Sequence, residues 1–401
     1  MYWVRRNTRF AYAINGLQNA TTSLPIWLLF YTRQLHLSVT AAIVLLIARW
    51  GTVALCNIPT GAWADRFGRI KMYRLGQFFY ALSFLPFLFT NNFVLLFVVQ
   101  IIGGLMASMS IGVVEPLIKD TYELAGLPPR KFTHFLSNNT VVLYIFRLAA
   151  GIFGAWLYVK HPYGPYACDA GILMLAYVAS LFMKEFRQES ATAYSNRQHI
   201  GEALRYVWNH TYLRNFFFAL ILVAIATEST WTGLQPIFVY KDLPTATFGI
   251  LFGIVALLSA LGAYVSRHIA DKVDGIKIYW CITMAATVGT ALFLVPAQWV
   301  SIIALIPLGL AFGFIEPIGN TNFQRHTTSK YQSTVLSLRS LLYTGFYALV
   351  SVLVGRYVDL FTTKTMILII TIQGAVCSLV LGGIWLATAL PVRPKPQVET
   401  V

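Results

Sequence analysis

The stretch GAWADRFGRIK, residues 61–71, sets four charged side chains and two glycines between two long apolar segments, 39–63 and 72–89. Glycine allows sharp turns and close approach of helices. Asp65 lies at the end of the first apolar segment, where a carboxylate can stabilise the positive end of a neighbouring helix. The basic residues after it can pair with acidic side chains elsewhere. The stretch therefore predicts a tight, charged connection between two helices.

The apolar character of these two segments extends over the whole chain. Of the 401 residues, 57% are hydrophobic and 11% are charged, whereas about 25% of the residues in a soluble domain are charged. This composition excludes a disordered chain, a collagen-like fibre and a disulfide scaffold. We expect an all-α integral membrane protein, because a backbone in lipid has to satisfy its own hydrogen bonds.

Hydropathy predicts twelve transmembrane helices, since a span needs about 20 mostly apolar residues. Their ranges are 9–32, 39–63, 72–89, 93–118, 135–158, 164–183, 214–239, 246–266, 277–296, 299–323, 333–357 and 363–389. The first span carries Asn15, Gln18 and Asn19, which a cleavable signal peptide would not contain. We therefore expect it to be a membrane helix of the protein.

Lys and Arg are distributed unequally over the connections between these spans. Of the 30, 22 fall on the side that carries both termini, five on the opposite side and three within spans. The positive-inside rule then places both termini in the cytoplasm, and we expect a multi-pass protein of the plasma membrane. The net charge of +15 needs no nucleic-acid partner, because basic side chains at a cytoplasmic surface face the anionic lipid bilayer.

The chain divides into two similar halves. The segment GVVEPLIKDTY, residues 112–122, recurs as GFIEPIGNTNF, residues 313–323, with Gly, Glu and Pro in register. A weaker copy of the 61–71 stretch follows the eighth span, at 268–277. Six spans on either side of a linker are typical of secondary transporters. We expect two pseudo-symmetric six-helix bundles at 1–183 and 214–390, a cytoplasmic linker at 184–213 and a disordered cytoplasmic tail at 391–401.

The second part of the linker predicts a helix at the cytoplasmic surface. Its apolar residues share one helical face: Ile200, Leu204, Val207 and Trp208. One interpretation is an amphipathic helix that lies on the membrane surface. An ordinary helix that covers the end of the bundle fits equally well.

The spacing Gly61-x-x-x-Asp65-Arg66-x-Gly68-Arg69-x-Lys71, directly after the second span, resembles the signature loop of the major facilitator superfamily. The second copy and the six-plus-six topology extend the resemblance over essentially the whole chain. The resemblance implies a conformational latch that holds the cytoplasmic side closed in the outward-facing state. Its residues would be Gly61, Asp65, Arg66, Gly68, Arg69 and Asp120. The alternative is that the basic residues only set the topology.

Two features depart from the proton-coupled drug exporters of this superfamily. Such exporters usually carry a Gly/Pro-rich motif in the fifth helix, whereas this chain has Gly151 and Gly154 there without a Gly-Pro pair. They also often carry an arginine within the fourth helix, where this chain has Gln100. Both departures weaken the interpretation as a drug/proton antiporter.

Ionisable side chains within spans are costly and usually functional. The resemblance implies that helices 1, 4, 7 and 10 line a central cavity, and the buried acids lie mainly on the last three of these. The ionisable residues within spans are Glu115, Asp169, Glu228, Glu316, Arg49, Arg147 and Arg339. The candidates for substrate or proton binding are Glu228, Arg147, Arg49, Glu115, Glu316, Asn19 and Gln235.

The three acids on the cavity helices suggest different roles. Glu115 and Glu316 occupy equivalent positions, each before a proline that disrupts the helix. A feature used in both halves favours gating or inter-helix pairing over substrate contact. Glu228 has no equivalent in the first span, and removal from water disfavours its charged form unless a cation pairs with it. Proton coupling or substrate binding, and a structural ion pair with an arginine, both stay open for Glu228.

The bases within spans have several possible partners. Arg49 and Arg147 can each bind an anionic group or neutralise an acid within the bundle, and the structural role is slightly favoured. Arg339 lies near the cytoplasmic start of its span, so we expect it at the interface or in the latch. Asp169 lies near the outer end of its span, where we expect it to be solvated.

Three function classes were compared. A secondary transporter that moves a small molecule by alternating access fits best, with proton-coupled efflux ahead of metabolite uptake by a symporter or uniporter; the acids on the cavity helices slightly favour a cationic or proton-coupled cargo. An enzyme is disfavoured, because the chain has no HExxH, GxSxG or P-loop motif. A transport-dead receptor or scaffold is a remote alternative. We expect small-molecule and proton partners, a monomer, and no metal or cofactor.

Overall fold

The computed structural model describes residues 2–185, 197–270, 272–328 and 331–389, which are almost entirely helical. The first part of the chain forms α1 Tyr2–Asn19, α2 Trp27–Arg33, α3 Val39–Phe67, α4 Arg69–Leu82, α5 Phe93–Ser110, α6 Val114–Leu124, α7 Pro129–Lys160 and α8 Gly164–Leu181. The second part forms α9 Arg197–Asn209, α10 Thr211–Tyr240, α11 Phe248–Ile269, α12 Gly275–Leu292, α13 Gln298–His326, α14 Gln332–Leu360 and α15 Thr363–Ala389. Two 3-10 helices, η1 Leu85–Leu88 and η2 Thr245–Thr247, precede α5 and α11. The prediction of an all-α protein is confirmed.

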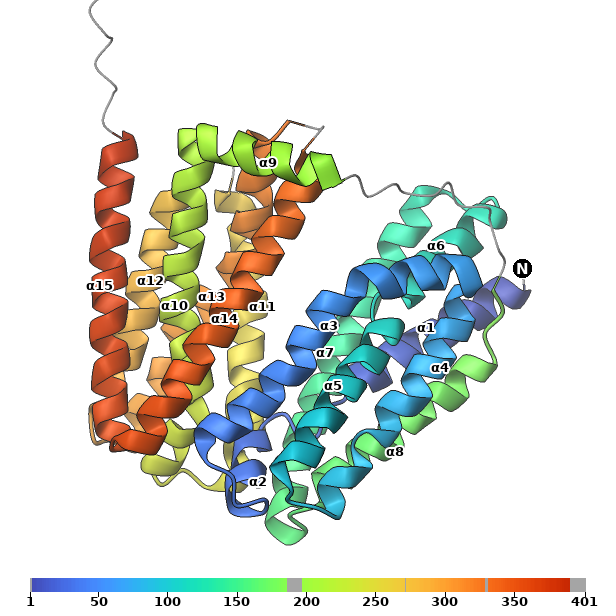
Figure 1. Cartoon of the computed structure of the whole chain (residues 1–401), viewed down its shortest axis with the longest axis horizontal. Helices are drawn as coiled ribbons and strands as arrows, with labels where there is room; N and C mark the ends of the chain where they lie inside the picture. The colour runs from blue at the N-terminus through green and yellow to red at the C-terminus, as the bar shows by residue number, and fades with distance from the viewer. Residues whose placement is uncertain (1, 186–196, 271, 329–330, 390–401) are drawn as a thin grey trace, which may run out of the picture.

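The helices form two bundles, α1 to α8 and α10 to α15 (Figure 1). The bundles converge at the end that carries α2 and diverge toward the end that carries α9. Helix α9 lies across that second end of the C-terminal bundle, where Tyr206 donates a hydrogen bond to the carbonyl oxygen of His326. The expected tail, 391–401, and linker residues 186–196 lie outside the described residues.

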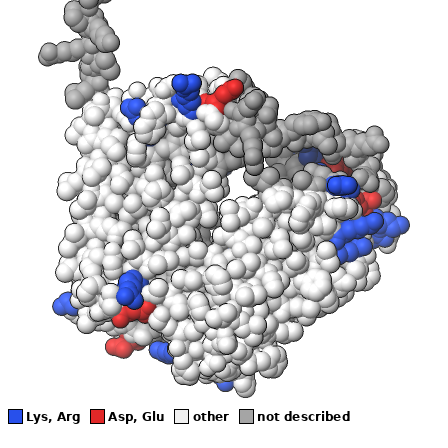
Figure 2. Space-filling model, in the orientation of Figure 1, with Lys and Arg blue, Asp and Glu red and all other residues white. Residues whose placement is uncertain are grey.

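The outer surface of the bundles suits a lipid bilayer. Ten segments of the described chain are long and apolar enough to cross a membrane. The two other expected spans are missing from this set because α1 is rich in polar residues and α4 has only 14 residues, so the count of twelve stays a prediction. Large apolar side chains such as Phe89, Leu55 and Leu379 are exposed, and charged side chains gather toward the two ends (Figure 2). Lipid contact accounts for so much exposed apolar surface.

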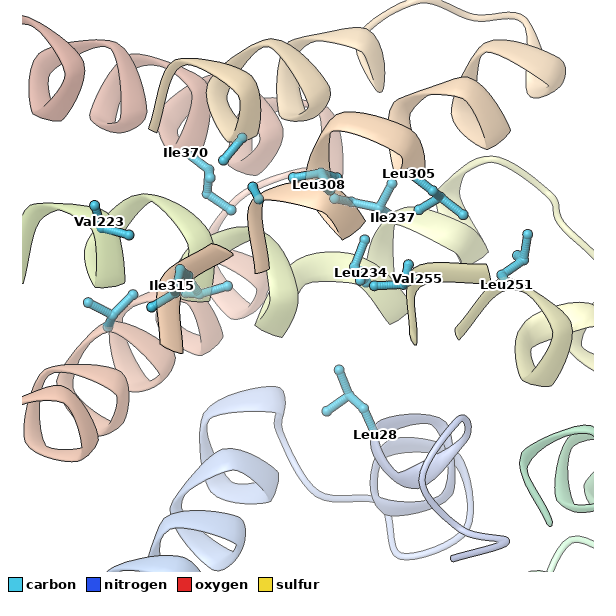
Figure 3. Packing of buried hydrophobic residues seen from close by; sticks show 14 of the residues in the cluster. Leu28, Val223, Leu234, Ile237, Leu251, Val255, Leu305, Leu308, Ile315 and Ile370 are labelled. Atoms are coloured by element: carbon cyan, nitrogen blue, oxygen red, sulfur yellow. The ribbon is translucent and has the colours of Figure 1, made fainter. Parts of the chain in front are cut away.

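Helix α10 forms the centre of the C-terminal bundle. Its Val223, Leu234 and Ile237 are fully buried among aliphatic side chains of the neighbouring helices (Figure 3). Leu28 of α2 reaches the same cluster from the N-terminal bundle. The apolar core is therefore continuous between the bundles at the α2 end.

The first expected span is broken between α1 and α2, at residues 20–26. The break frees backbone N–H groups, which need new acceptors. Asp169 of α8 supplies them: one carboxylate oxygen accepts from the N–H (2.6 Å) and hydroxyl (2.7 Å) of Thr22, and the other accepts from the N–H (3.2 Å) and hydroxyl (2.5 Å) of Ser23. Asp169 is only 2% exposed. The expectation that it is solvated was wrong, because the broken helix recruits it.

The fourth expected span is also broken, between α5 and α6. Gly112 lies at the break with φ +76°, a left-handed conformation that favours glycine. Its counterpart Gly313 lies inside the continuous helix α13. A Cβ atom at Gly313 would overlap the carbonyl oxygen of Ser259 in α11, so this glycine serves close helix packing. The repeated motif therefore adopts two different conformations.

Candidate functional site: a cavity between the bundles

The two bundles are joined at the α2 end. Gln235 of α10 accepts hydrogen bonds from the N–H groups of Leu28 and Leu29, and its amide donates to the carbonyl oxygen of Leu24. The carboxylate of Asp359 accepts from the N–H groups of Val39 and Thr40, at 2.8 and 2.9 Å. Within the described residues, the hydrogen bonds between the bundles all lie at this end.

Glycines bring the bundles into backbone contact at the same end. Gly249 of α11 packs on Gly151 of α7 so closely that a Cβ atom on Gly249 would overlap the carbonyl oxygen of Gly151. Gly355 of α14 similarly leaves room only for the start of α3, at Thr40. These contacts close the space between the bundles on the α2 side.

A cavity of about 580 Å³ lies between the bundles (Figure 2 shows an opening between them). It is built mainly from the N-terminal bundle. Its lining residues are Asn15, Gln18, Asn19, Thr21, Ser23, Leu24, Trp27, Tyr31, Ile43, Leu46, Arg49, Trp50, Tyr80, Phe84, Gln100, Ser110, Ile111, Gly112, Val114, Glu115, Asn139, Leu143, Arg147, Tyr166, Trp231, Thr232, Gln235, Phe252, Tyr347 and Ser351. The volume suits one small molecule.

The two helix breaks supply part of this lining. Ser23 and Leu24 come from the break between α1 and α2, and Ile111 and Gly112 come from the break between α5 and α6. Irregular backbone at membrane depth is tolerated where it lines a cavity. The breaks therefore place backbone polar groups beside the space that a substrate would occupy.

Four of the predicted site residues contribute polar groups to the cavity lining from both bundles. Arg147 of α7 donates from Nη2 to the amide oxygen of Asn19, at 3.0 Å, and both residues line the cavity. Glu115 also lines it, and within the described residues it has no hydrogen bond or ion pair. Gln235 completes the set from the opposite bundle. Neither Glu115 nor Arg147 is paired with an ionised partner in the described chain.

Arg49 of α3 lies deeper, with 8% of its surface exposed. Its guanidinium carbon lies 4.5 Å from the ring centre of Phe84 and 5.5 Å from that of Tyr80. Cation–π contact of this kind stabilises a desolvated guanidinium. The Nε and Nη2 atoms are buried without a hydrogen-bond partner. The structure therefore does not join Arg49 to Glu115 or Glu228.

Glu228 of α10 lies outside the described lining of the cavity, within the C-terminal bundle. It is 8% exposed and accepts a short hydrogen bond from the hydroxyl group of Tyr343 in α14. No arginine or lysine pairs with it among the described residues. Thr232, one helical turn further along α10, and Tyr347, one turn beyond Tyr343, both line the cavity. Glu228 is thus one helical turn away from residues that a substrate can contact.

Glu316 forms an inter-helix ion pair. Both of its oxygens accept from Arg339 of α14, at 2.6 and 3.1 Å, and Asn320 accepts from the same guanidinium. The Arg339 side chain is 7% exposed and that of Glu316 is 70% exposed. Gly319 leaves room for the Arg339 guanidinium, which is buried inside the bundle and does not extend into solvent as expected of a snorkelling side chain. A place in the latch stays a prediction for Arg339.

The family of the chain follows from its match to a sequence model. The model of the Major Facilitator Superfamily matches residues 9–345. This match covers most of the chain, including both breaks, the signature loop and α13. The chain belongs to the major facilitator superfamily. The protein is accordingly a multi-pass membrane transporter, as the resemblance of the 61–71 stretch implied.

Individual members of the superfamily are more distant. The uncharacterized MFS-type transporter YxaM of Bacillus subtilis (strain 168) is 23% identical over 349 residues, which cover 82% of each chain. The nucleoside transporter NupG superposes with a TM-score of 0.76 at 13% identity, covering 96% of this chain and 99% of that one. The peptide transporter POT in complex with sulfate also gives 0.76 at 13% identity, covering 96% and 94%. At these identities the structural neighbours show the superfamily fold and no substrate.

The superfamily loop connects α3 and α4. Arg69 Nη1 lies 2.7 Å from the Asp120 carboxylate of α6, which is the pair that the resemblance implied. Gly68 turns the chain with φ +103°, whereas Gly61 has open space where a side chain would lie. Arg66 is exposed and contacts the ring of Phe67. The side chain of Asp65 lies outside the described residues, so its part in the superfamily latch stays a prediction.

Two functional positions were missed by sequence reasoning. Glu185 accepts from the N–H groups of Arg69 and Ile70, at 2.7 and 3.2 Å, and so caps α4 in the manner expected of Asp65. Its position in the linker gave no signal. Tyr343 bonds Glu228, and a tyrosine within an apolar span is too common to be singled out. Glu185 and Tyr343 can be recognised only once the structure shows which groups they contact.

Proposed function

We propose that this protein is a proton-coupled secondary active transporter that moves a small molecule through the 580 Å³ cavity by alternating access. The observation that carries the proposal is the one-sided closure of this cavity. Gln235, Asp359 and the Gly151–Gly249 contact hold the bundles together at the α2 end, and the bundles diverge toward α9. Rocking the bundles about the cavity would open the other side.

The α9 end is proposed to face the cytoplasm. The connections at this end carry most of the Lys and Arg, which the positive-inside rule assigns to the cytoplasmic side of a plasma membrane. The structure then represents the inward-open state. The Arg69–Asp120 ion pair is already formed in this state within the N-terminal bundle, so a latch between the bundles would add further contacts to it when this side closes. A reporter enzyme active only outside the cytoplasm, fused after Ala389, should stay inactive, and activity would reverse the orientation.

Glu228 is proposed to take up and release the coupled proton. Its carboxylate is buried, it is hydrogen-bonded to a neutral tyrosine and it has no cationic partner among the described residues. Tyr347 and Thr232 connect its surroundings to the cavity. A proton on Glu228 would then bias the bundle between two states, since protonation removes a charge from an apolar interior.

Efflux is the proposed direction, and dye accumulation tests it. Cells would express wild type, Glu228→Gln or the control Glu123→Gln, whose parent residue is an exposed acid on α6. The dyes are anionic fluorescein and cationic ethidium, each with and without a proton uncoupler. We expect wild type and Glu123→Gln to lower accumulation of at least one dye, and both Glu228→Gln and the uncoupler to restore it. Normal efflux by Glu228→Gln in energised cells would remove Glu228 from the coupling path.

Uptake by proton symport is the second candidate. It is favoured by the two arginines of the cavity lining, which outnumber its single glutamate among the described residues. Accumulation of an anion against a negative interior potential needs energy, which a coupled proton can supply. In the same assay, symport would make wild type raise accumulation of fluorescein, and the uncoupler would abolish the rise. Equal accumulation in all expressing and empty cells, with confirmed membrane expression, would contradict export and import of these dyes alike.

A further inference from the structure

Arg49 has hydrogen-bonding capacity that the protein leaves unused. A guanidinium carries five N–H donors and no acceptor. The Nε and Nη2 atoms of Arg49 are buried without a hydrogen-bond partner, although the residue is only 8% exposed and borders the cavity. Buried charged donors are normally satisfied. The third nitrogen, Nη1, is not among these buried atoms, so it is the donor that Arg49 can present to a ligand in the cavity.

Asp169, an acid of the same bundle, is already satisfied. Both of its oxygens accept from Thr22 and Ser23. Within the described residues no hydrogen bond or ion pair joins it to Arg49, so the Nε and Nη2 atoms stay without an acceptor.

Aromatic side chains surround this arginine. The rings of Phe84 and Tyr80 lie beside the guanidinium, and Tyr31 stacks on Phe87 with ring centres 5.4 Å apart. Nine of the thirty residues that line the cavity are aromatic. Gln100 donates to the Tyr31 hydroxyl group, and its own amide oxygen is a buried acceptor without a partner. The wall thus offers flat apolar surface together with polar groups that lack partners.

The charge of the cavity lining opposes a cationic cargo. Among the described residues, the Lys, Arg, Asp and Glu side chains of the lining are Arg49, Arg147 and Glu115. Glu228 and Glu316, the other acids of the cavity helices, lie outside this lining. The lining therefore contains two arginines and one glutamate. Of the two arginines, Arg49 is the one whose guanidinium lies beside aromatic rings among the described residues.

We propose that the cavity binds a small aromatic carboxylate, whose carboxylate group accepts hydrogen bonds from Arg49 and whose ring packs on the aromatic wall of Tyr80 and Phe84. A carboxylate accepts a strong, charge-assisted hydrogen bond from a guanidinium N–H group. The inference names a substrate class for the proposed transporter, so it rests on the proposed function for the claim that the bound compound is moved.

Three probes of similar size and different charge test the inference on purified wild-type protein in detergent. They are benzoate, benzyl alcohol and benzylamine at pH 7. Binding is followed by tryptophan fluorescence, because Trp27, Trp50 and Trp231 line the cavity. We expect benzoate to bind at least about ten times more tightly than either of the other probes. Equal affinities, or a preference for benzylamine, would overturn the inference.

Arginine variants assign the preference to Arg49. Arg49→Met is expected to weaken benzoate binding about tenfold or more and to leave benzyl alcohol unaffected, whereas Arg356→Met, at an exposed arginine of α14, is the matched control and should bind as wild type. Arg49→Lys keeps the charge but replaces the guanidinium by a single nitrogen, so its benzoate affinity should fall between those of wild type and Arg49→Met. If Arg49→Met fails to fold, the Arg49→Lys result decides. Wild-type benzoate affinity in Arg49→Lys, or in a folded Arg49→Met, contradicts the inference.

Flux separates this inference from the proposed function. Proteoliposomes containing benzoate would be tested for exchange with labelled external benzoate. Tight binding to Arg49 without exchange would support the site and count against transport of this class. Flux of other compounds without any benzoate binding would leave the transporter in place and overturn the carboxylate class.

Discussion

The two halves of this transporter use the same duplicated motif in different ways. In the N-terminal half, Gly112 breaks the helix and Glu115 faces the cavity without a partner in the described chain. In the C-terminal half, Gly313 lies inside a continuous helix and Glu316 is bonded to Arg339. The N-terminal half also contributes both arginines of the cavity lining. At this motif the N-terminal half presents its glutamate to the cavity, and the C-terminal half keeps its glutamate in an ion pair between helices.

This difference suggests a division of labour. Broken helices with unpaired polar groups are suited to recognising a substrate, because the substrate can complete their hydrogen bonds. Buried pairs such as Glu228 with Tyr343 are suited to changing state when a proton arrives. Duplication gives both halves the same starting sequence, and each half has specialised. Four sets of variants test whether the two halves differ in this way.

The largest effect on stability is expected at the break between α1 and α2 in the N-terminal half. Asp169→Ala would leave three buried donors of Thr22 and Ser23 without an acceptor, since the Thr22 hydroxyl group can still donate to the carbonyl oxygen of Pro165. Removing one member of a buried charged network costs about 3–5 kcal/mol, so we expect a large drop in the melting temperature of the purified protein. Asp169→Asn keeps the shape of the side chain and one acceptor oxygen, so its melting temperature should lie between those of wild type and Asp169→Ala. An unchanged melting temperature for Asp169→Ala would mean that the break does not depend on this carboxylate.

The second-largest effect is expected at the glycine contact between the two bundles. Gly249→Val would push α11 away from Gly151 of α7. Overpacking of this kind costs about 1–3 kcal/mol, which changes the ratio of two states by about 5- to 150-fold. Spin labels at Lys160 and Lys364, in a background without the native cysteines, should report a larger separation at the α2 end.

The matched control for this variant is Gly383→Val. Gly383 of α15 has open space around it, so its distance distribution should equal that of the wild type. If Gly249→Val also kept the wild-type distribution, the glycine contact would have no part in closing the cavity.

The duplicated glutamates give a direct test of the two environments. Glu316→Gln removes the charge that holds the buried Arg339, and loss of a hydrogen-bonded charge partner costs about 2 kcal/mol. Glu115→Gln changes an exposed side chain without a bond in the described chain, so its stability should stay within about 0.5 kcal/mol of wild type. Thermal unfolding of the purified variants would measure both. Equal destabilisation would show that the halves treat their glutamates alike.

Much of the fold could be predicted from the sequence because membrane helices have to be long, apolar and internally hydrogen-bonded. The charge and glycine pattern of 61–71 identified the superfamily, and the helix positions followed from hydropathy. Apolar length does not show where a helix is interrupted, since a broken segment such as Phe93–Leu124 is as hydrophobic as a continuous one. The break of the first span depends on the acceptor Asp169, which lies far along the chain, so the neighbouring sequence does not show where that span is interrupted.

The site was predicted less completely, for a physical reason. Sequence position gives the depth of Arg49, Arg147 and Glu228 in the membrane, but it does not give the direction in which each side chain points. Glu115 and Glu316 look equivalent in the sequence, yet only Glu316 has an arginine across from it. A pairing depends on two helices at once. A single sequence therefore identifies the candidates and leaves their partners open.

The smallest expected change in stability concerns Gly112, where the direction of the change is informative. Its φ of +76° costs a residue with a side chain about 1–2 kcal/mol, and no atom lies near enough for a methyl group to clash. Gly112→Ala should therefore lower stability by about 1 kcal/mol through the backbone alone. Gly345→Ala, at an equally open glycine inside α14, should raise stability by about 0.5–1 kcal/mol, because alanine favours the helix. Opposite shifts in thermal unfolding would show that the break is held in the protein, whereas stabilisation by both variants would mean that the N-terminal half can adopt the continuous helix of its counterpart.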